Sequence, residues 1–168
     1  GIKILDKLLT PTVILIGIED NKPKAIKALQ QATATIEKIK VCIVPTKYPT
    51  GGEKQLVQIL TGQEVKSGRL PIHDGIVMQN VATCFAINEA VRHDTPLIRR
   101  VVTVTGQGLN KPQNVWALLG TPVKFLLEQC DVQDVENERQ PVIMGGPMMG
   151  FSVSSDLVPI VKTSNCIL

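Results

Sequence analysis

Two short segments carry residue types that bind anionic ligands at the end of a strand. In residues 48–53, Gly51 and Gly52 let the backbone approach a ligand closely just before a helix begins. In the second segment, residues 79–83, Asn80 and Thr83 lie beside the first N–H groups of another predicted helix, where a phosphate would bind. Both segments follow a predicted strand, and ligands of open α/β sheets bind at the carboxyl ends of strands.

The same residues have a purely structural interpretation. Asn80 can be only a helix N-cap and the two glycines only a turn, and spacing alone favours that interpretation because such caps are common. The sequence GGEK at residues 51–54 is not a Walker A phosphate-binding loop, which needs GxxxxGK followed by Ser or Thr.

Other candidates for chemistry are weaker. Residues 145–150, GGPMMG, favour a turn with core methionines over a ligand loop. His73 and His93 lack the spacing of metal ligands, so we expect no metal site. No Ser/His/Asp or Cys/His arrangement supports a hydrolase or transferase. The cysteines form no CxxC pair and favour a reduced, cytosolic chain; they are Cys42, Cys84, Cys130 and Cys166.

Composition excludes two function classes. The chain has 18 Lys and Arg against 15 Asp and Glu, a net charge of +3, and only 3% aromatic residues, so no nucleic-acid partner is expected. No apolar stretch approaches the roughly 20 residues that span a bilayer, so we expect no direct membrane span.

The first part of the chain alternates strands and helices, which predicts a parallel α/β sheet. Asn21 is the expected N-cap of the second helix, with Pro23 in its first turn, and Gly62 the expected end of the third. The predicted elements are a helix at 2–9, a strand at 13–18, a helix from Asn21, a strand at 41–44, a helix at 53–61, a strand at 75–78 and a helix at 80–93.

The pattern changes near Thr95, and the second part predicts a small sheet crossed by one helix. Thr121 is the expected cap of that helix, which buries Val123, Leu126, Leu127 and Cys130. The predicted elements are strands at 100–105 and 115–119, a helix at 122–130, and strands at 142–147 and 157–161. The last four residues, NCIL, resemble an unfinished strand, which suggests a piece of a longer protein.

Five ordered blocks resemble one family along essentially the whole chain. They are YPTGGEKQL (48–56), LPIHDGIVMQNVAT (70–83), RRVVTVTGQGLNKPQN (99–114), LLGTPVKFLLEQC (118–130) and VIMGGPMMG (142–150). Together they resemble the C subunit of the Rnf ion-translocating electron transport complex, and more distantly the NADH-binding flavoprotein subunit of respiratory complex I. The resemblance implies the C-terminal half of a Rossmann-like parallel α/β flavin domain (1–97), then a small β-grasp domain of the soluble-ligand-binding type (98–168).

The resemblance also implies an activity. Members of this family pass electrons between NAD(H), the flavin FMN and 4Fe-4S clusters to drive ion translocation. Their partners are other subunits of a membrane complex, and we expect this chain at the cytoplasmic face of the bacterial inner membrane as a peripheral part of an NADH-linked oxidoreductase (translocase) subunit. The alternative is that residues 98–168 are only a docking module for partner subunits.

The family's cofactor-binding positions can be transferred residue by residue. The loop beside flavin and nicotinamide matches Tyr48, Gly51, Gly52 and Glu53. The segment that holds the flavin phosphate matches Gln79, Asn80 and Thr83, and an acidic position near the cofactor matches Glu19. Gly52 stands where the complex I relatives carry an acidic residue, so the nicotinamide geometry can differ here.

Two parts of the family's machinery have no counterpart in this sequence. The glycine-rich flavin loop should precede Gly1, and the cluster cysteines should follow Leu168. We therefore expect a central fragment that is inactive by itself and has neither flavin nor iron bound.

Overall fold

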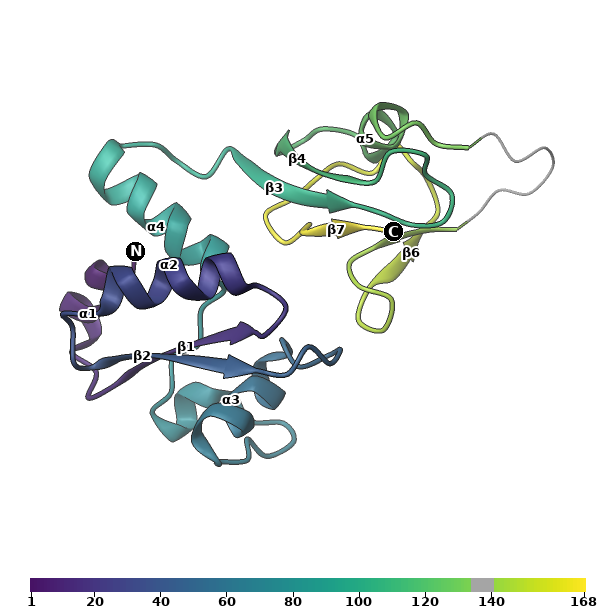
Figure 1. Cartoon of the computed structure of the whole chain (residues 1–168). Helices are drawn as coiled ribbons and strands as arrows, with labels where there is room; N and C mark the ends of the chain where they lie inside the picture. The colour runs from purple at the N-terminus through teal and green to yellow at the C-terminus, as the bar shows by residue number, and fades with distance from the viewer. Residues whose placement is uncertain (134–140) are drawn as a thin grey trace. The chain divides into compact units, whose positions relative to one another are not determined.

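The structure, a computed structural model, describes residues 1–133 and 141–168. The chain divides into two compact units, Gly1–Asn88 and Glu89–Leu168 (Figure 1). Helix α4, Val81–His93, continues across this division. The domain ranges 1–97 and 98–168 stay a prediction.

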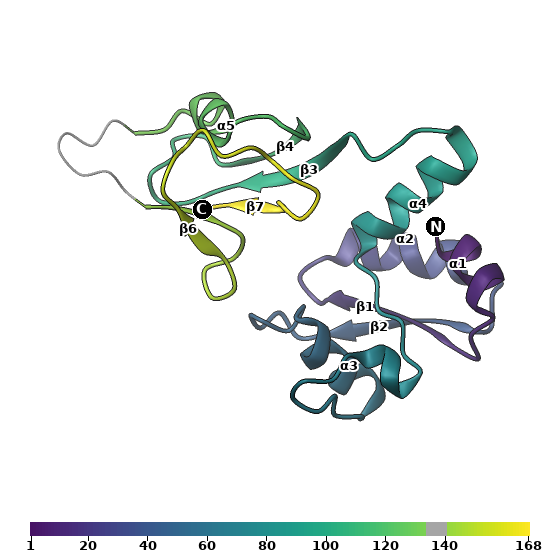
Figure 2. The same ribbon diagram turned by 180° about the vertical axis from the view of Figure 1, so that it is seen from behind.

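The first unit is a short parallel sheet with helices on both faces. Strands β1 and β2 pair in parallel, from Ile14 beside Ile39 to Glu19 beside Val44. Helix α2 lies on one face of this sheet and α3 on the other (Figures 1 and 2). The elements are α1 (Ile2–Leu9), β1 (Ile14–Glu19), α2 (Pro23–Thr33), β2 (Ile39–Val44), α3 (Glu53–Thr61), the 3-10 helix η1 (Pro71–Asp74) and the start of α4.

Local sequence explains two of the helix ends in this unit. Helix α3 ends at Gly62, whose φ of 75° lies in the left-handed region that glycine adopts easily, as predicted. Pro23 lies in the first turn of α2, as predicted, but the expected cap at Asn21 is wrong because Lys22 is the N-cap and the helix begins at Pro23. The Asn21 side-chain oxygen instead accepts a hydrogen bond from Lys22 Nζ at 2.9 Å.

The predicted third strand at residues 75–78 is wrong. Within the described residues this sheet has two strands, and the chain after η1 runs without sheet pairing towards α4. Gly75 ends η1 in the left-handed region with φ 74°, and Ile76 N–H donates to Pro71 O at 3.1 Å. A four-residue apolar run does not by itself distinguish a strand from an irregular segment.

Among its described residues, the second unit holds a separate five-stranded sheet, in the order β4-β3-β7-β5-β6. β3 and β7 are parallel, and the other neighbours are antiparallel. The expected strand at the end of the chain is confirmed as β7. The elements are β3 (Arg99–Val104), β4 (Gln113–Leu118), α5 (Val123–Gln129), β5 (Val142–Met144), β6 (Phe151–Val153) and β7 (Cys166–Ile167).

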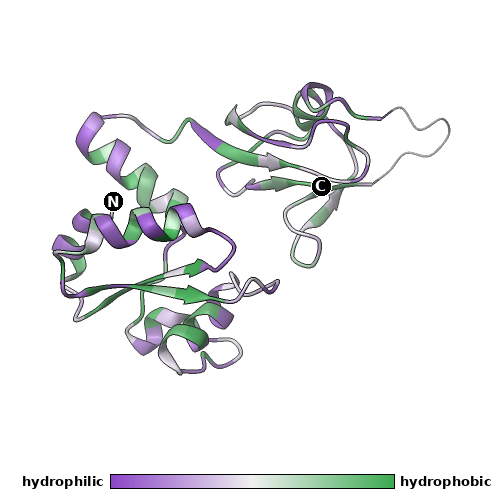
Figure 3. Ribbon diagram, viewed as in Figure 1, coloured by the Kyte–Doolittle hydropathy of each residue, from purple (hydrophilic) through white to green (hydrophobic). Residues whose placement is uncertain are grey.

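A closed hydrophobic core holds this second sheet and α5 together. Val102, Val104 and Ile167 are fully buried. The predicted apolar stripe of α5 is confirmed, because Val123, Leu126 and Cys130 belong to the same core and Leu127 packs against it. In Figure 3 the hydrophobic colour marks parts of β3, β7 and α5 as well as β1 and β2 in the first unit.

Two sequence expectations about the elements of the second unit are wrong. Residues 157–161 form only one isolated bridge, Pro122 with Pro159, although Ile160 is fully buried. Pro159 has no N–H to donate, which disfavours a longer ladder. Pro122, not Thr121, is the N-cap of α5.

The glycine-rich turn after β5 does not bury the methionines that it contains. Met144 at the end of β5 is buried, but Met148 and Met149 are 71% and 72% exposed, which corrects the expectation of core methionines. The turn is tight, because a Cβ placed on Gly150 would lie 2.6 Å from Gly146 O.

Candidate functional site

The loop between β2 and α3, together with the first residue of α3, carries four of the predicted site residues. Tyr48 is 51% exposed, and Glu53 is the first residue of α3. The loop is shaped by its own backbone, because Thr50 N–H donates to Lys47 O at 2.7 Å and Gly52 N–H donates to Pro49 O at 2.8 Å. The Thr50 hydroxyl also donates to Lys47 O, and the Thr50 residue is buried.

The two glycines of this loop differ in their surroundings. A Cβ placed on Gly51 would meet no atom of the described residues within 4 Å, so the backbone is open to an approaching ligand there. A Cβ on Gly52 would lie 2.4 Å from Gln55 Oε1 and 3.1 Å from Pro49 O. Gly52 is the N-cap of α3 and offers no side-chain oxygen to it.

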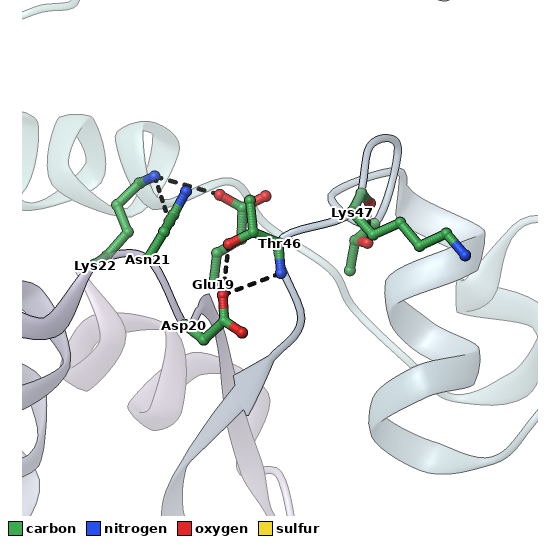
Figure 4. A network of polar contacts seen from close by, with 7 residues as sticks. Glu19, Asp20, Asn21, Lys22, Thr46 and Lys47 are labelled. Atoms are coloured by element: carbon green, nitrogen blue, oxygen red, sulfur yellow. Dashed lines mark hydrogen bonds and ion pairs between the residues drawn. The ribbon is translucent and has the colours of Figure 1, made fainter.

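Glu19 lies at the carboxyl end of β1, at the same edge of the sheet as the β2–α3 loop. Its carboxylate forms an ion pair with Lys22 Nζ at 3.3 Å. The next residue, Asp20, accepts two hydrogen bonds from Thr46 (Figure 4). The Thr46 hydroxyl lowers the pKa of the Asp20 carboxyl below its ordinary value, so Asp20 is an anion at neutral pH.

The third group, Gln79, Asn80 and Thr83, lies at the start of α4, and all three residues are exposed. Asn80 Oδ1 accepts a hydrogen bond from Ala82 N–H at 2.9 Å, so Asn80 does cap the helix. The cap uses the amide oxygen of Asn80. Its amide nitrogen, Nδ2, can donate a hydrogen bond to a phosphate oxygen. Capping and phosphate binding by Asn80 are therefore compatible.

A shallow hollow brings two of the predicted segments together. Glu53 from the start of α3 and Gln79 from the segment before α4 both line it. Its volume is about 260 Å³, below the roughly 300–1,000 Å³ of sites that enclose a drug-sized ligand. The other lining residues are mainly apolar: Leu70, Pro71, Ile72, Ile76, Val77 and Met78.

Metal and thiol chemistry receive no support from the described residues. Within residues 1–133 and 141–168, no group of three or more His, Cys, Asp and Glu side chains could hold a metal ion. All four cysteines are free. Burial raises the pKa of the Cys84 and Cys166 thiols, which disfavours the reactive thiolate form.

Sequence reasoning missed Asp20 and Thr46, although a signal was present. Asp20 follows the apolar strand β1 directly, and a carboxylate at the carboxyl end of a parallel strand is in the place where such sheets bind ligands.

In the described part of the chain, no helix combines the length and apolar character that crossing a bilayer requires.

Two family models match the chain. The model of the Nuo51 FMN-binding domain matches residues 1–89, and the model of the SLBB domain matches residues 101–130. The first range contains all eight predicted site residues.

Curated relatives match along the entire chain. They are C subunits of ion-translocating oxidoreductase complexes, and the chain is 54% identical to the one from Edwardsiella ictaluri, 52% identical to the one from Vibrio cholerae and 55% identical to the one from Yersinia enterocolitica. The matches cover 100% of this chain but only 21%, 22% and 24% of these relatives. The resemblance drawn from the five sequence blocks is confirmed.

Proposed function

The chain belongs to the Nuo51 FMN-binding domain family, and from this we propose that it is part of a subunit that transfers electrons through FMN in an ion-translocating oxidoreductase complex. When bound, FMN exchanges electron pairs with a nicotinamide and single electrons with iron–sulfur clusters. NAD(H) is the proposed nicotinamide, and 4Fe-4S clusters are the proposed acceptors or donors. The other subunits of the complex are the proposed partners, at the cytoplasmic face of the membrane.

The proposed fold assignment is finer than the α/β architecture described above. The first unit corresponds to the second half of a Rossmann-like flavin domain, and the second unit to a β-grasp domain. The parallel β1–β2 pair with helices on both faces supports the first assignment. The mixed sheet packed on α5 supports the second.

Each candidate residue has a proposed task at the flavin. Asn80 Nδ2 and the Thr83 hydroxyl donate to the phosphate, next to the N–H groups of the first turn of α4. Gln79 lies beside them. The open backbone at Gly51 fits a flat ring at close approach, because no atom of the described residues lies within 4 Å of a Cβ placed there.

The remaining residues of the loop would contact the flavin or the nicotinamide. Tyr48 is half exposed and can stack on the ring of the flavin or the nicotinamide. Gly52, the N-cap of α3, leaves the start of this helix without a side chain at that position. Glu53 and Glu19 supply carboxylates at the same edge of the sheet. Glu19 is balanced by Lys22, so an anionic cofactor would meet a neutral pair there.

The match to the FMN-binding domain carries this proposal, and one geometric observation supports it: Glu53 and Gln79 line the same hollow. They are 26 residues apart in sequence and come from the two segments that the sequence predicts to bind the cofactor. The hollow alone is smaller than sites that enclose a ligand of this size. We therefore expect this chain by itself to retain flavin poorly.

The test measures flavin binding by the full-length protein. Asn80→Ala or Thr83→Val should weaken flavin binding by about 1–3 kcal/mol, because a hydrogen bond to a charged group is lost. The matched controls are Asn114→Ala and Thr103→Val, which remove an exposed Asn–Thr hydrogen bond of 2.8 Å in the second unit. Unchanged flavin binding with a sharp loss of stability in Asn80→Ala and Thr83→Val would mean that both residues are only structural.

A second candidate function concerns the second unit alone, as a docking module for partner subunits. The outer face of β3 and β4 exposes Val101, Trp116 and Leu118, at 45%, 56% and 58%. Arg99 lies over the Trp116 ring at 5.0 Å. Aromatic residues and Arg are enriched in protein interfaces. Leu118→Ser should then weaken co-purification with the other subunits while flavin binding stays unchanged.

A further inference from the structure

Asp20 joins the two loops at the carboxyl edge of the first sheet. Its Oδ1 accepts hydrogen bonds from Thr46 N–H at 3.1 Å and from the Thr46 hydroxyl at 2.6 Å. Asp20 N–H in turn donates to Val44 O at 2.9 Å. The residue after β1 is thus bonded both to the last residue of β2 and to the loop that follows it (Figure 4).

The loop that Asp20 holds is the one that carries Tyr48, Gly51, Gly52 and Glu53. Beyond Thr46 this loop is shaped by short-range bonds, from Thr50 N–H to Lys47 O and from Gly52 N–H to Pro49 O. Such bonds fix the shape of the loop but do not attach it to the sheet. The Asp20–Thr46 pair attaches the start of this loop to the end of β1, two residues before Tyr48.

The neighbouring charged groups leave this pair undisturbed. Glu19 is engaged with Lys22 at 3.3 Å, and Lys22 also donates to Asn21 at 2.9 Å. The Lys47 side chain extends away from Asp20 towards α3 (Figure 4). Asp20 is exposed, so its bonds compete with water, and removing them should loosen the loop more than the whole fold.

We propose that Asp20 is a positioning residue, which acts through Thr46 to hold the Tyr48–Glu53 loop in place against the flavin and the nicotinamide. This inference rests on the function proposed above for that loop. Asp20 itself need not touch either ligand.

The first measurement follows the loop without any ligand. Hydrogen exchange of the Thr50 and Gly52 amides should become about three- to tenfold faster in Asp20→Ala and in Thr46→Val. Asp20→Asn should restore much of the protection, because an amide oxygen can accept the same two bonds. Asp156→Ala, which removes an exposed carboxylate from the second unit, is the matched control and should change neither rate.

The second measurement follows binding in the protein as the cell makes it. Asp20→Ala should raise the KM for NADH by about three- to tenfold, with a smaller change in kcat, and Asp20→Asn should restore most of it. Unchanged exchange of Thr50 and Gly52 in both Asp20→Ala and Thr46→Val would overturn the inference. Faster exchange with an unchanged KM would overturn it too. Failure of the proposed function shows separately, as unchanged flavin binding in Asn80→Ala and Thr83→Val.

Discussion

The two units of this chain bury their apolar residues to very different degrees. In the second unit Val102, Val123 and Ile160 are completely buried, in a core shared by the sheet and α5. In the first unit β1 contains no buried residue, and α4, which continues into the second unit, contains none either. Ile26 of α2 is 9% exposed, although it is the buried residue of that helix.

The difference shows which unit depends on its surroundings. Parallel sheets are normally buried on both faces, and two strands alone make a marginal sheet. Every residue of β1 stays partly exposed, although α2 and α3 lie on the two faces of the sheet (Figure 1). The first unit has such a pair of strands and carries every candidate cofactor residue. We therefore expect ligands or partners to add stability to the first unit, whereas the second unit is held by its own core.

The largest effect should come from removing core volume in the second unit. Ile160→Ala should lower its free energy of unfolding by about 3–5 kcal/mol, because a fully enclosed side chain leaves a cavity. Ile26→Ala should cost the first unit only about 1–2 kcal/mol, since water can fill the space. Urea unfolding followed by Trp116 fluorescence measures the first variant, and amide exchange in α2 and β1 the second. Equal losses would contradict the contrast between the units.

Flavin should stabilise the two units unequally. At a concentration 100 times its dissociation constant, FMN should add about 2.7 kcal/mol to the stability of the unit that binds it. In the protein as the cell makes it, amide exchange at Val57 should slow with added FMN, while exchange at Val102 should not change. Slowing at Val102 alone would mean that the flavin binds the other unit.

Two glycines should separate a binding role from a packing role. Gly150→Ala should destabilise the second unit by about 1–3 kcal/mol, because the new methyl group would lie 2.6 Å from Gly146 O and 2.7 Å from Ile143 Cγ2. Gly51→Ala should change stability by less than about 0.5 kcal/mol and still weaken flavin or NADH binding. Thermal unfolding and flavin titration of both variants test this, and a large loss of stability in Gly51→Ala would oppose it.

The smallest expected effect is a loss of stability at low pH. Because its pKa is lowered in the folded state, Asp20 stabilises the β1–β2 edge above the ordinary pKa of an aspartate, and this contribution disappears as the pH falls through the lowered value. The Thr46 amide resonance should shift in an NMR titration with a midpoint below that ordinary pKa. A midpoint at or above it would mean that the Asp20–Thr46 bonds do not persist in solution.

The sequence alone determined the elements whose signals are local. Pro23 and Gly62 set the start of α2 and the end of α3, and the apolar stripe of α5 identified its buried face. The ordered motif blocks were enough to recognise the family, since they depend on residue identity and not on geometry. They also supplied the eight candidate site residues, whose roles stay predictions.

Only the tertiary structure decided which apolar runs become strands and which polar groups meet. Residues 75–78 and 157–161 have strand-like composition, but pairing depends on a partner strand that their own sequence does not specify. The bond between Asp20 and Thr46 joins residues 26 positions apart, and it exists because parallel pairing brings the ends of β1 and β2 to one edge. The meeting of Glu53 and Gln79 at one hollow has the same kind of cause, since the path of the chain after α3 brings the segment before α4 back to the start of α3.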